Sequence, residues 1–422
     1  MTGKARLPLE GEIGESLELE AEEVLPAPPG HPRFPLLDSI RALAAISVLL
    51  VHVGIFTGGF APWYKQLFAH LDFGVPVFFL LSGFLLYRPM LAARVSGLRK
   101  QRLSAYARNR FVRILPAYWV VLTVAALVPG FYGAFSGNWW VYYGLLQNFP
   151  VFTAEGVCAV NGFDCGLPVA WSLSVEIFFY LLLPVYAFAM AGLARFYDRS
   201  RWIVAELSGL ALITAVSLYI QSSTPASDLD TWLFFSPLGR GWWFALGMAI
   251  AVISVAQAER PETIRPVSWV KDHFGICWLI AAALYCFTAI VVLDPSPSLA
   301  FPVIDNSDYL VSVIVFGISA SFILLPAVFG SETRGFVQTV LRHPVLVWLG
   351  LISYGIFLWH YPVIGVLSDL DARNWVPSLM FPVIALLTFV FTVILAAISF
   401  YLIERPLMRW ARGHRQSEPA AD

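Results

Sequence analysis

Charged residues are scarce in this chain of 422 residues. Only 13% are Asp, Glu, Lys or Arg, whereas about 25% is usual in soluble globular proteins, and 58% are hydrophobic. This composition excludes an ordinary soluble domain and indicates a membrane protein. The formal net charge of -1, without a periodic Lys/Arg stripe, also excludes a strongly basic nucleic-acid binder.

Several familiar sequence signals are missing as well. No metal-ligand cluster, phosphate loop or dinucleotide fingerprint occurs, so we expect no bound metal or cofactor. The first residues are rich in Glu and Pro instead of basic and then apolar, which excludes a signal peptide. We therefore expect residues 1–34 to form a disordered acidic cytoplasmic tail, and the first apolar segment to stay in the protein.

The apolar runs are long and continuous, which favours helices over the alternating strands of a barrel. About 20 apolar residues are enough to cross a hydrocarbon core of roughly 30 Å. The sequence predicts an all-α polytopic bundle of ten transmembrane helices over residues 35–406, followed by a short basic cytoplasmic tail at 407–422. A shorter run, Trp139–Val151, is expected to be interfacial or re-entrant. The predicted spans are Leu36–Phe56, Phe73–Ala92, Phe111–Pro129, Ala170–Ala191, Trp202–Ile220, Trp232–Ala256, Gly275–Leu293, Tyr309–Phe329, Val345–Leu367 and Ser378–Ile403.

Lys and Arg gather in alternate connections between these runs. The richest connection, after the second run, includes Arg94, Arg102, Arg108, Arg110 and Arg113, whereas the next connection contains no Lys or Arg. By the positive-inside rule both termini are cytoplasmic, and the protein is expected to be a multi-pass protein of the plasma (inner) membrane. A role in topology and in contacting lipid head groups is one explanation for this cluster.

The four cysteines fit this orientation. Cys158 and Cys165 lie in the uncharged connection, hence outside, where the oxidising environment favours a disulfide between them. A zinc site is the rival interpretation, but no other Cys or His is near them in the sequence. Cys277 and Cys286 are expected to be inert thiols within the seventh span.

Ionisable residues deep in the predicted spans are costly and are therefore candidates for function. Arg41 and His52 share one stripe of the first span, only ~20° apart around the helix and roughly 16 Å apart along it. Glu176 and His360 lie roughly 9–10 Å from the outer ends of their spans, and His52 about 6 Å from its own. Three groups that can exchange protons thus share one layer.

Each of these residues also has a purely structural interpretation. Arg41 can pair with Asp38 one turn earlier and anchor the first span, His52 can be hydrogen-bonded within the bundle, and His360 can belong to an interfacial belt. Glu176 is harder to explain in this way, because a buried carboxylate needs a cation or a proton, and a neighbouring imidazole would serve.

The functional interpretation combines these groups. A neutral His oriented by a carboxylate is suited to removing a proton from a hydroxyl during acyl transfer. Arg41, nearer the cytoplasm, suits the phosphates of an acyl-coenzyme A. Proton-coupled transporters use the same residue types, with His52, Glu176 and His360 as a proton relay, so a transporter or exporter of acyl groups or glycan precursors remains an alternative. A non-catalytic scaffold for envelope-polymer assembly is a third.

Six short segments occur along the chain at positions that fit the predicted spans: LDSIRALAA (37–45), FFLLSGF (78–84), RFVRILP (110–116), WSLSVE (171–176), SYGIFLWHYP (353–362) and ERP (404–406). Together with the Arg41-to-His52 spacing, these segments resemble the motifs of the acyltransferase-3 family of bacterial integral membrane O-acyltransferases. The resemblance extends from Pro35 to Pro406.

The resemblance implies a reaction and a set of partners. The expected co-substrate is acyl-CoA, and in particular acetyl-CoA, while the acceptor is a hydroxyl, commonly on a sugar of a cell-envelope glycan, a glycolipid or a secondary metabolite. The bilayer is the other expected partner. Nothing in the sequence indicates the oligomeric state.

The resemblance also implies roles for individual residues. His52 becomes the general base, and Glu176 either orients His52 or binds the acceptor. Ser82 is a possible donor contact, and a serine nucleophile is the alternative, although the sequence places no base beside it. The remaining assignments are Arg41, Arg110 and Arg113 as donor-binding residues and His360, Arg240 and Tyr354 as acceptor-binding or accessory residues.

Two departures from the family pattern bear on the acceptor. In the segment RGWWF (240–244), many family members carry Glu where Trp243 stands, so acceptor recognition is expected to differ, whereas Arg240 can hold an acidic sugar or anchor its helix at the interface. The chain ends soon after Glu404, so we expect no appended extracytoplasmic hydrolase-like domain of the kind that some relatives carry.

Overall fold

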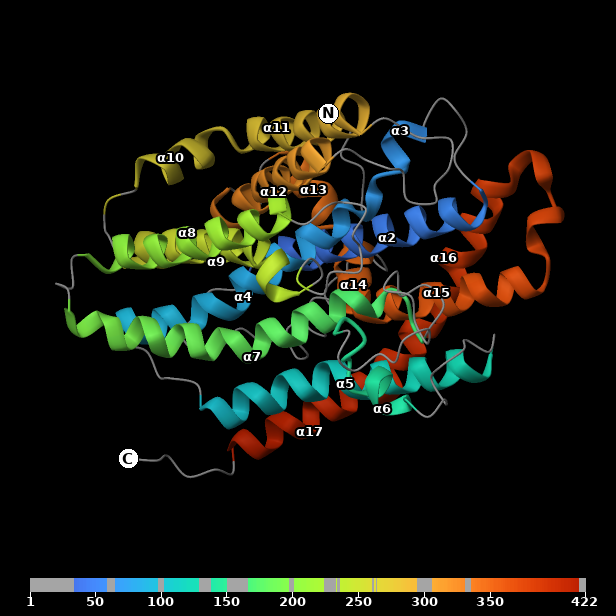
Figure 1. Cartoon of the computed structure of the whole chain (residues 1–422), viewed down its shortest axis with the longest axis horizontal. Helices are drawn as coiled ribbons and strands as arrows, with labels where there is room; N and C mark the ends of the chain where they lie inside the picture. The colour runs from blue at the N-terminus through green and yellow to red at the C-terminus, as the bar shows by residue number, and fades with distance from the viewer. Residues whose placement is uncertain are drawn as a thin grey trace, which may run out of the picture.

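The computed structural model describes residues 34–58, 65–97, 102–128, 138–149, 166–196, 201–223, 233, 236–259, 262, 264–293, 306–330 and 335–416. These residues form helices and turns, and none of them lies in a strand. The long helices run roughly side by side along the horizontal axis of Figure 1. The all-α prediction is therefore confirmed.

The long helices follow the predicted apolar runs closely. They are α2 (Leu36–Phe56), α4 (Gly74–Val95), α5 (Leu103–Leu127), α7 (Ala170–Leu193), α8 (Trp202–Ser223), α9 (Pro237–Glu259), α11 (Phe274–Phe287) with the π-helical turn η4 (Thr288–Val292), α12 (Asn306–Phe329), α14 (Pro344–Leu351), α15 (Ser353–Asp369) and α16 (Met380–Ser399). The shorter elements are α3 (Lys65–Phe68), η1 (Leu71–Phe73), α6 (Trp139–Tyr143), η2 (Ala194–Phe196), α10 (Arg265–Asp272), α13 (Phe336–Leu341), η5 (Ala372–Asn374), η6 (Pro377–Leu379), η7 (Phe400–Glu404) and α17 (Arg405–Gln416).

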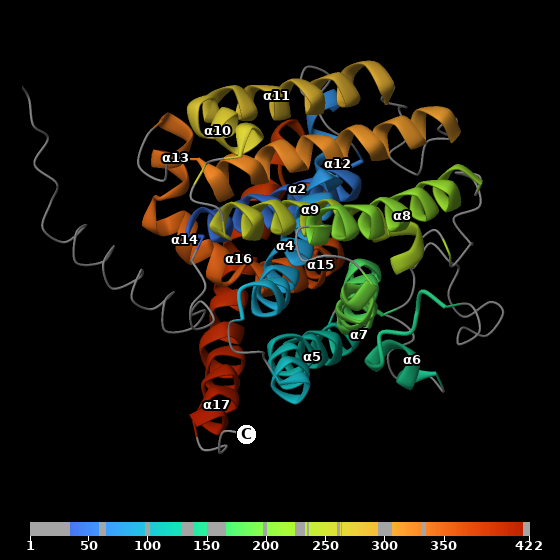
Figure 2. The same cartoon turned by 90° about the vertical axis from the view of Figure 1, so that its left-hand side faces the viewer.

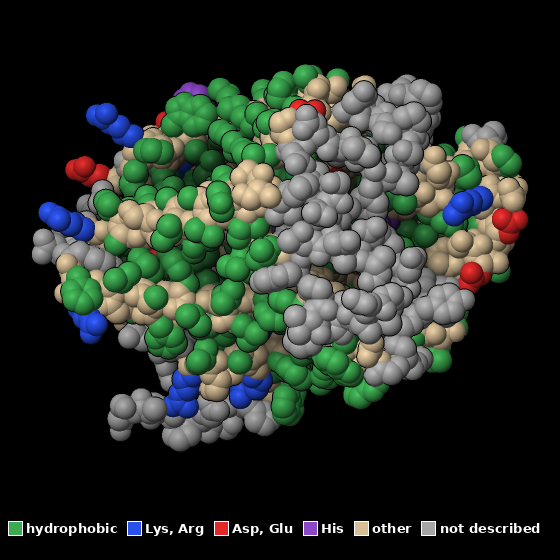
Figure 3. All heavy atoms as spheres, in the orientation of Figure 1, with side chains coloured by type: hydrophobic (Ala, Val, Ile, Leu, Met, Phe, Trp, Pro, Cys, Tyr) green, Lys and Arg blue, Asp and Glu red, His purple; other side chains and the backbone are tan. Residues whose placement is uncertain are grey.

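Nine helical segments of the described chain are long and apolar enough to cross a membrane, or ten if the bent pair α14 and α15 forms one span. The two helices of this pair meet at 72°, around Ile352. Each predicted span thus corresponds to a helical segment, and the ninth is broken in the middle. Figure 3 shows the described charged side chains mostly towards the left and right ends of the view, with hydrophobic side chains between them.

The centre of the bundle is formed by α2, α4 and α9. In the apolar stretch of α9, 72% of residues are buried, compared with 17% in α8. Figures 1 and 2 both place the central helices between α11 and α12 on one side and α5 and α7 on the other. The outer helices therefore expose apolar side chains, as lipid-facing helices do.

Two glycines set the distance between α4 and α9. A Cβ atom at Gly83 would lie 2.2 Å from the Phe244 carbonyl oxygen, and one at Gly247 would lie 2.0 Å from the Leu80 carbonyl oxygen. Small residues let membrane helices approach this closely. The pair of glycines thereby fixes the register of α4, which carries Ser82.

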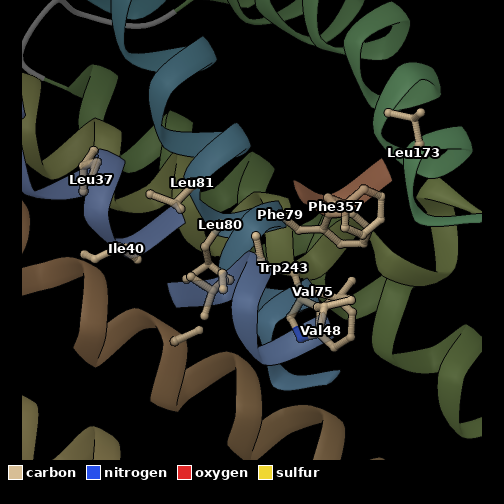
Figure 4. Close-up of a cluster of buried hydrophobic side chains, with 14 of the residues drawn as sticks. Leu37, Ile40, Val48, Val75, Phe79, Leu80, Leu81, Leu173, Trp243 and Phe357 are labelled. Carbon is tan, nitrogen blue, oxygen red and sulfur yellow. The ribbon is translucent and has the colours of Figure 1, made fainter. Parts of the chain in front are cut away.

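Hydrophobic side chains fill the junction of α2, α4, α7, α9 and α15. Figure 4 shows Val48, Val75, Phe79, Leu173 and Phe357 among the buried residues of this cluster. Phe79 stacks on Phe244 of α9 with 4.5 Å between ring centroids. The candidate site adjoins this cluster, since Val75, Phe79, Leu173 and Phe357 also line a cavity.

Candidate active site

A cavity lies among α2, α4, α5, α7 and α15. Five of the predicted functional residues line it from four helices, together with Tyr354 at the start of α15. The bend between α14 and α15 turns the chain here, so that α15 begins beside the cavity. The five are Arg41, Ser82, Arg110, Arg113 and Glu176.

Three arginines supply the positive charge of the cavity. Arg110 and Arg113 are three residues apart on α5 and therefore share a face of that helix. Arg113 interacts electrostatically with Arg41 and Arg110. The Arg110 guanidinium lies 5.9 Å from the centroid of the Tyr180 ring, and its Nε atom is buried without a hydrogen-bond partner. An anionic ligand would satisfy this cluster.

Arg41 combines both interpretations considered for it. Its Nη1 atom donates a hydrogen bond to Asp38 Oδ1 at 2.8 Å, so the pairing one turn earlier is present. The same side chain also lines the cavity. Asp38 therefore neutralises part of the charge while holding Arg41 on the cavity side of α2.

Ser82, Glu176 and Tyr180 form a hydrogen-bonded cluster on the cavity wall. The Ser82 hydroxyl and the Tyr180 hydroxyl both donate to Glu176 Oε1. Tyr180 follows Glu176 by four residues on α7, one turn away on the same face. Tyr180 was not among the predicted site residues, although its spacing from Glu176 was the signal that could have identified it.

His52 and His360 form a second cluster, which does not line the cavity. His52 Nδ1 lies 2.8 Å from the Val48 carbonyl oxygen and 3.2 Å from His360 Nε2. His360 Nδ1 lies 3.2 Å from the Ile356 carbonyl oxygen. The two histidines predicted to share one layer are thus in direct contact.

Glu176 does not join this pair. Its hydrogen bonds go to Ser82 and Tyr180, whereas those of His52 go to Val48 and His360. The expectation that Glu176 orients His52 directly is therefore wrong. Equal depth in the membrane brought the residues to one layer, but α7 presents Glu176 to α4, while the partner of His52 comes from α15.

The other two predicted accessory residues are held by the bundle. Arg240 is only 4% exposed, donates from Nη2 to the Tyr309 hydroxyl at 2.9 Å, and lies 5.0 Å from the Trp243 ring centroid. It belongs to a buried polar and aromatic cluster that is separate from the cavity lining, and its role at the acceptor or as an anchor stays a prediction. The Tyr354 hydroxyl donates to the Ile114 carbonyl oxygen at 2.9 Å, which ties α15 to α5 beside the cavity.

The two cysteines within the described residues belong to neither cluster. Cys277 is buried, Cys286 is half-buried, and both are free thiols. Cys158 and Cys165 lie outside the described residues, so their pairing stays a prediction.

The predicted segment Trp139–Val151 begins with the short helix α6 and continues in turns as far as it is described.

Comparison with known proteins identifies the class. The model of the acyltransferase domain family matches residues 34–401, which is most of the chain, so the chain belongs to the acyltransferase-3 family and is a multi-pass membrane protein. No solved structure matches it.

The names of two similar proteins state an activity. The chain is 27% identical over 397 residues to the peptidoglycan O-acetyltransferase OatA of Listeria monocytogenes, covering 89% of this chain and 56% of the relative. It is 26% identical over 397 residues to the O-acetyltransferase OatA of Staphylococcus aureus, covering 90% of this chain and 58% of the relative. The chain thus spans a little over half the length of these relatives.

Proposed function

We propose that this protein transfers an acetyl or other short acyl group from acyl-CoA to a hydroxyl of a cell-envelope sugar, with His52 as the general base. The family and the O-acetyltransferase names of its relatives support the reaction class. The positive-inside prediction supports the direction, because it puts the donor in the cytoplasm and the acceptor near the outer leaflet.

The observation that carries this proposal is the hydrogen bonding of the histidine pair. His360 Nδ1 contacts a carbonyl oxygen, which can only accept, so this nitrogen carries the hydrogen and Nε2 of the neutral ring is an acceptor. His52 Nδ1 likewise faces a carbonyl and carries its hydrogen. The lone pair of His52 is therefore on Nε2, which has no hydrogen-bond partner among the described residues.

This arrangement suits a general base. Nε2 of His52 can accept a proton from a hydroxyl, and the resulting imidazolium keeps Val48 and His360 as acceptors for its Nδ1 hydrogen. The position of that hydrogen follows from its neighbours, as is usual for catalytic histidines. His360 thus acts through His52 as a positioning residue.

The arginines of the cavity suit the donor. Phosphate groups bind arginine through paired, charge-assisted hydrogen bonds, and Arg41, Arg110 and Arg113 offer three guanidinium groups to one cavity. Phe357 lines that cavity, and its ring centroid lies 6.1 Å from that of His360. The cavity is therefore connected to the proposed base through Phe357 and then His360, which contacts His52.

Acyl transfer in inverted membrane vesicles tests the proposal. Radiolabelled acetyl-CoA is supplied together with crude envelope glycans and lipids to wild type, His52→Gln and the matched control His273→Gln. His273 is exposed and stacks on Trp269, so its replacement should not affect transfer. We expect label in an acceptor with wild type and His273→Gln, and none with His52→Gln. No label with folded wild type and several acyl donors would contradict the proposal and direct attention to proton-coupled transport.

A further inference from the structure

Two separate groups of side chains that can handle protons lie at or beside the candidate site. One is the His52–His360 pair, and the other is the cluster of Ser82, Glu176 and Tyr180 in the cavity. Direct transfer from donor to acceptor needs one base only, and His52 supplies it. The second cluster, which lies where the donor is proposed to bind, therefore calls for a chemical role of its own.

The cavity cluster has the arrangement of an activated nucleophile. A hydroxyl is bonded to a base, and that base is oriented by a third group, which is the recurrent pattern of covalent catalysis. Here Glu176 Oε1 accepts from the Ser82 hydroxyl and is held by the Tyr180 hydroxyl. Sequence analysis could place no base beside Ser82, and this contact provides one.

The surrounding packing holds Ser82 in place. Its neighbour Gly83 rests against the backbone of Phe244, where even a Cβ atom would be 2.2 Å from the carbonyl oxygen. Tyr180 in turn lies beneath the Arg110 guanidinium. Both sides of the Ser82–Glu176 contact are thus anchored to neighbouring helices, which keeps nucleophile and base aligned.

We propose that Ser82 carries the acyl group as an ester between two chemical steps, with Glu176 as its base. This inference rests on the proposed function and divides that reaction into a donor step with Glu176 as the base and an acceptor step with His52 as the base. It assigns one proton-handling group to each step.

In the first step, Ser82 Oγ attacks the carbonyl carbon of the acyl-CoA thioester while Glu176 takes the hydroxyl proton. The C–O bond forms, the C–S bond breaks, and the sulfur leaves as a thiolate with the bonding electron pair. The thiolate takes a proton from water once it has left the cavity. Glu176 keeps the serine proton, so the step ends with acyl-Ser82 and a protonated Glu176.

In the second step, the acceptor hydroxyl gives its proton to His52 Nε2 and its oxygen attacks the acyl carbon. The new ester C–O bond forms and the bond to Ser82 Oγ breaks. Glu176 returns its proton to the Ser82 oxygen, and His52 releases its proton to water. All groups are then in their starting states, and no oxidant or further reactant is required.

Trapping the ester tests this inference. Full-length protein in membranes is given radiolabelled acetyl-CoA without any acceptor, quenched in acid and mapped by peptide mass spectrometry. We expect about one acetyl group per chain on the peptide that contains Ser82, in wild type and in His52→Gln. Ser82→Ala should lower the label by about 100-fold or more. Ser321→Ala, which removes another helix serine hydroxyl outside the cavity, should label as wild type does.

A second variant keeps the result interpretable if Ser82→Ala does not fold. Ser82→Cys retains a nucleophile and should carry the acyl group as a thioester, which neutral hydroxylamine releases rapidly, whereas the serine ester is resistant. Label that stays hydroxylamine-resistant in Ser82→Cys would place the acyl group elsewhere and overturn the inference.

The same assays separate the two proposals. If wild type transfers acetyl to an acceptor but neither wild type nor His52→Gln traps an acyl-protein, the transfer is direct and only the covalent step is wrong. Label on His52 instead of Ser82 would make His52 the carrier of the acyl group and would overturn both the Ser82 assignment and the general-base role of His52. If wild type neither transfers nor traps acetyl from any acyl-CoA, the proposed function itself fails.

Discussion

The cavity and the histidine pair are close neighbours with opposite chemical character. The cavity gathers three arginines and the carboxylate of Glu176, whereas the histidine pair is bounded by backbone carbonyls and by the rings of Phe357 and Tyr361. Charged groups suit the binding of a polyanionic donor, and neutral acceptors suit an imidazole that must stay unprotonated until it meets a hydroxyl. This difference in character fits the two proposed roles, donor binding in the cavity and proton removal by the histidine pair.

The cavity and the histidine pair stay distinct because most of the side chains that line the cavity come from helices other than α2 and α15. Arg110 and Arg113 come from α5 and Glu176 from α7, while His52 and His360 come from α2 and α15. α15 contributes to both regions, because Tyr354 and Phe357 line the cavity and His360 faces His52. This helix therefore connects the proposed donor site with the proposed base.

The largest effect is expected for the steady-state kinetics of His52→Gln, which test whether the cavity and the histidine pair have separate roles. Because His52 is the proposed base and does not line the cavity, we expect kcat to fall by about 10²- to 10⁴-fold while the KM for acetyl-CoA changes little. Initial rates at varied donor concentration measure both constants. A raised KM with unchanged kcat would instead make His52 part of the donor site and remove the distinction.

The opposite pattern is expected for Arg113→Gln. Loss of a charged hydrogen-bond donor to phosphate costs about 1.5–3 kcal/mol, so the KM for acetyl-CoA should rise by roughly 10- to 100-fold with little change in kcat. Arg113→Lys should recover part of the loss, because the charge remains. Isothermal titration with CoA measures the affinity directly.

Arg373→Gln is the matched control for this arginine. Arg373 is exposed, lies 4.2 Å from the Phe56 ring centroid and does not line the cavity. Equal losses of CoA affinity in both variants would mean that general surface charge, and not the cavity, attracts the donor.

A smaller effect is expected for His360→Leu. Removing the acceptor beside His52 Nδ1 loses one hydrogen bond worth about 1 kcal/mol, so kcat should fall by about 5-fold. His360→Gln, which can still accept, should recover part of it. ¹⁵N spectra of labelled His52 should show the hydrogen on Nδ1 in wild type and a mixture of both ring nitrogens in His360→Leu. An unchanged spectrum with lowered kcat would limit His360 to a packing role.

The fold was largely predictable because a membrane span needs a continuous apolar run, and such runs are visible in the sequence. Leu36–Phe56 was predicted with the bounds that α2 has. The break between α14 and α15 was not foreseen, because the run Val345–Leu367 is long enough for one span and contains no Pro near the 72° bend at Ile352. Direction changes of this kind depend on tertiary packing, here of Gly350 against the backbone of Asp38.

The depth of the candidate site residues in the membrane was predictable, but the direction in which each side chain points was not. A rise of about 1.5 Å per residue places His52, Glu176 and His360 in one layer. Their partners depend on how each helix is rotated and on which helix lies next to it, and a single sequence does not specify either. For this reason the contact between His52 and His360 and that between Ser82 and Glu176 became visible only in the assembled bundle.

The smallest expected effect concerns the side chain between the two regions. Phe357 lines the cavity, and its ring lies 6.2 Å from that of Phe78 and 6.1 Å from that of His360. Phe357→Leu should make room at this end of the cavity for a longer acyl chain. A buried methylene is worth about 0.8 kcal/mol, so kcat/KM for propionyl-CoA relative to acetyl-CoA should rise by roughly 4-fold. Phe322→Leu on α12, outside the cavity, should leave this ratio unchanged. An unchanged ratio in Phe357→Leu would mean that the acyl group does not reach this wall, and the donor would then have to deliver it to Ser82 from the arginine side alone.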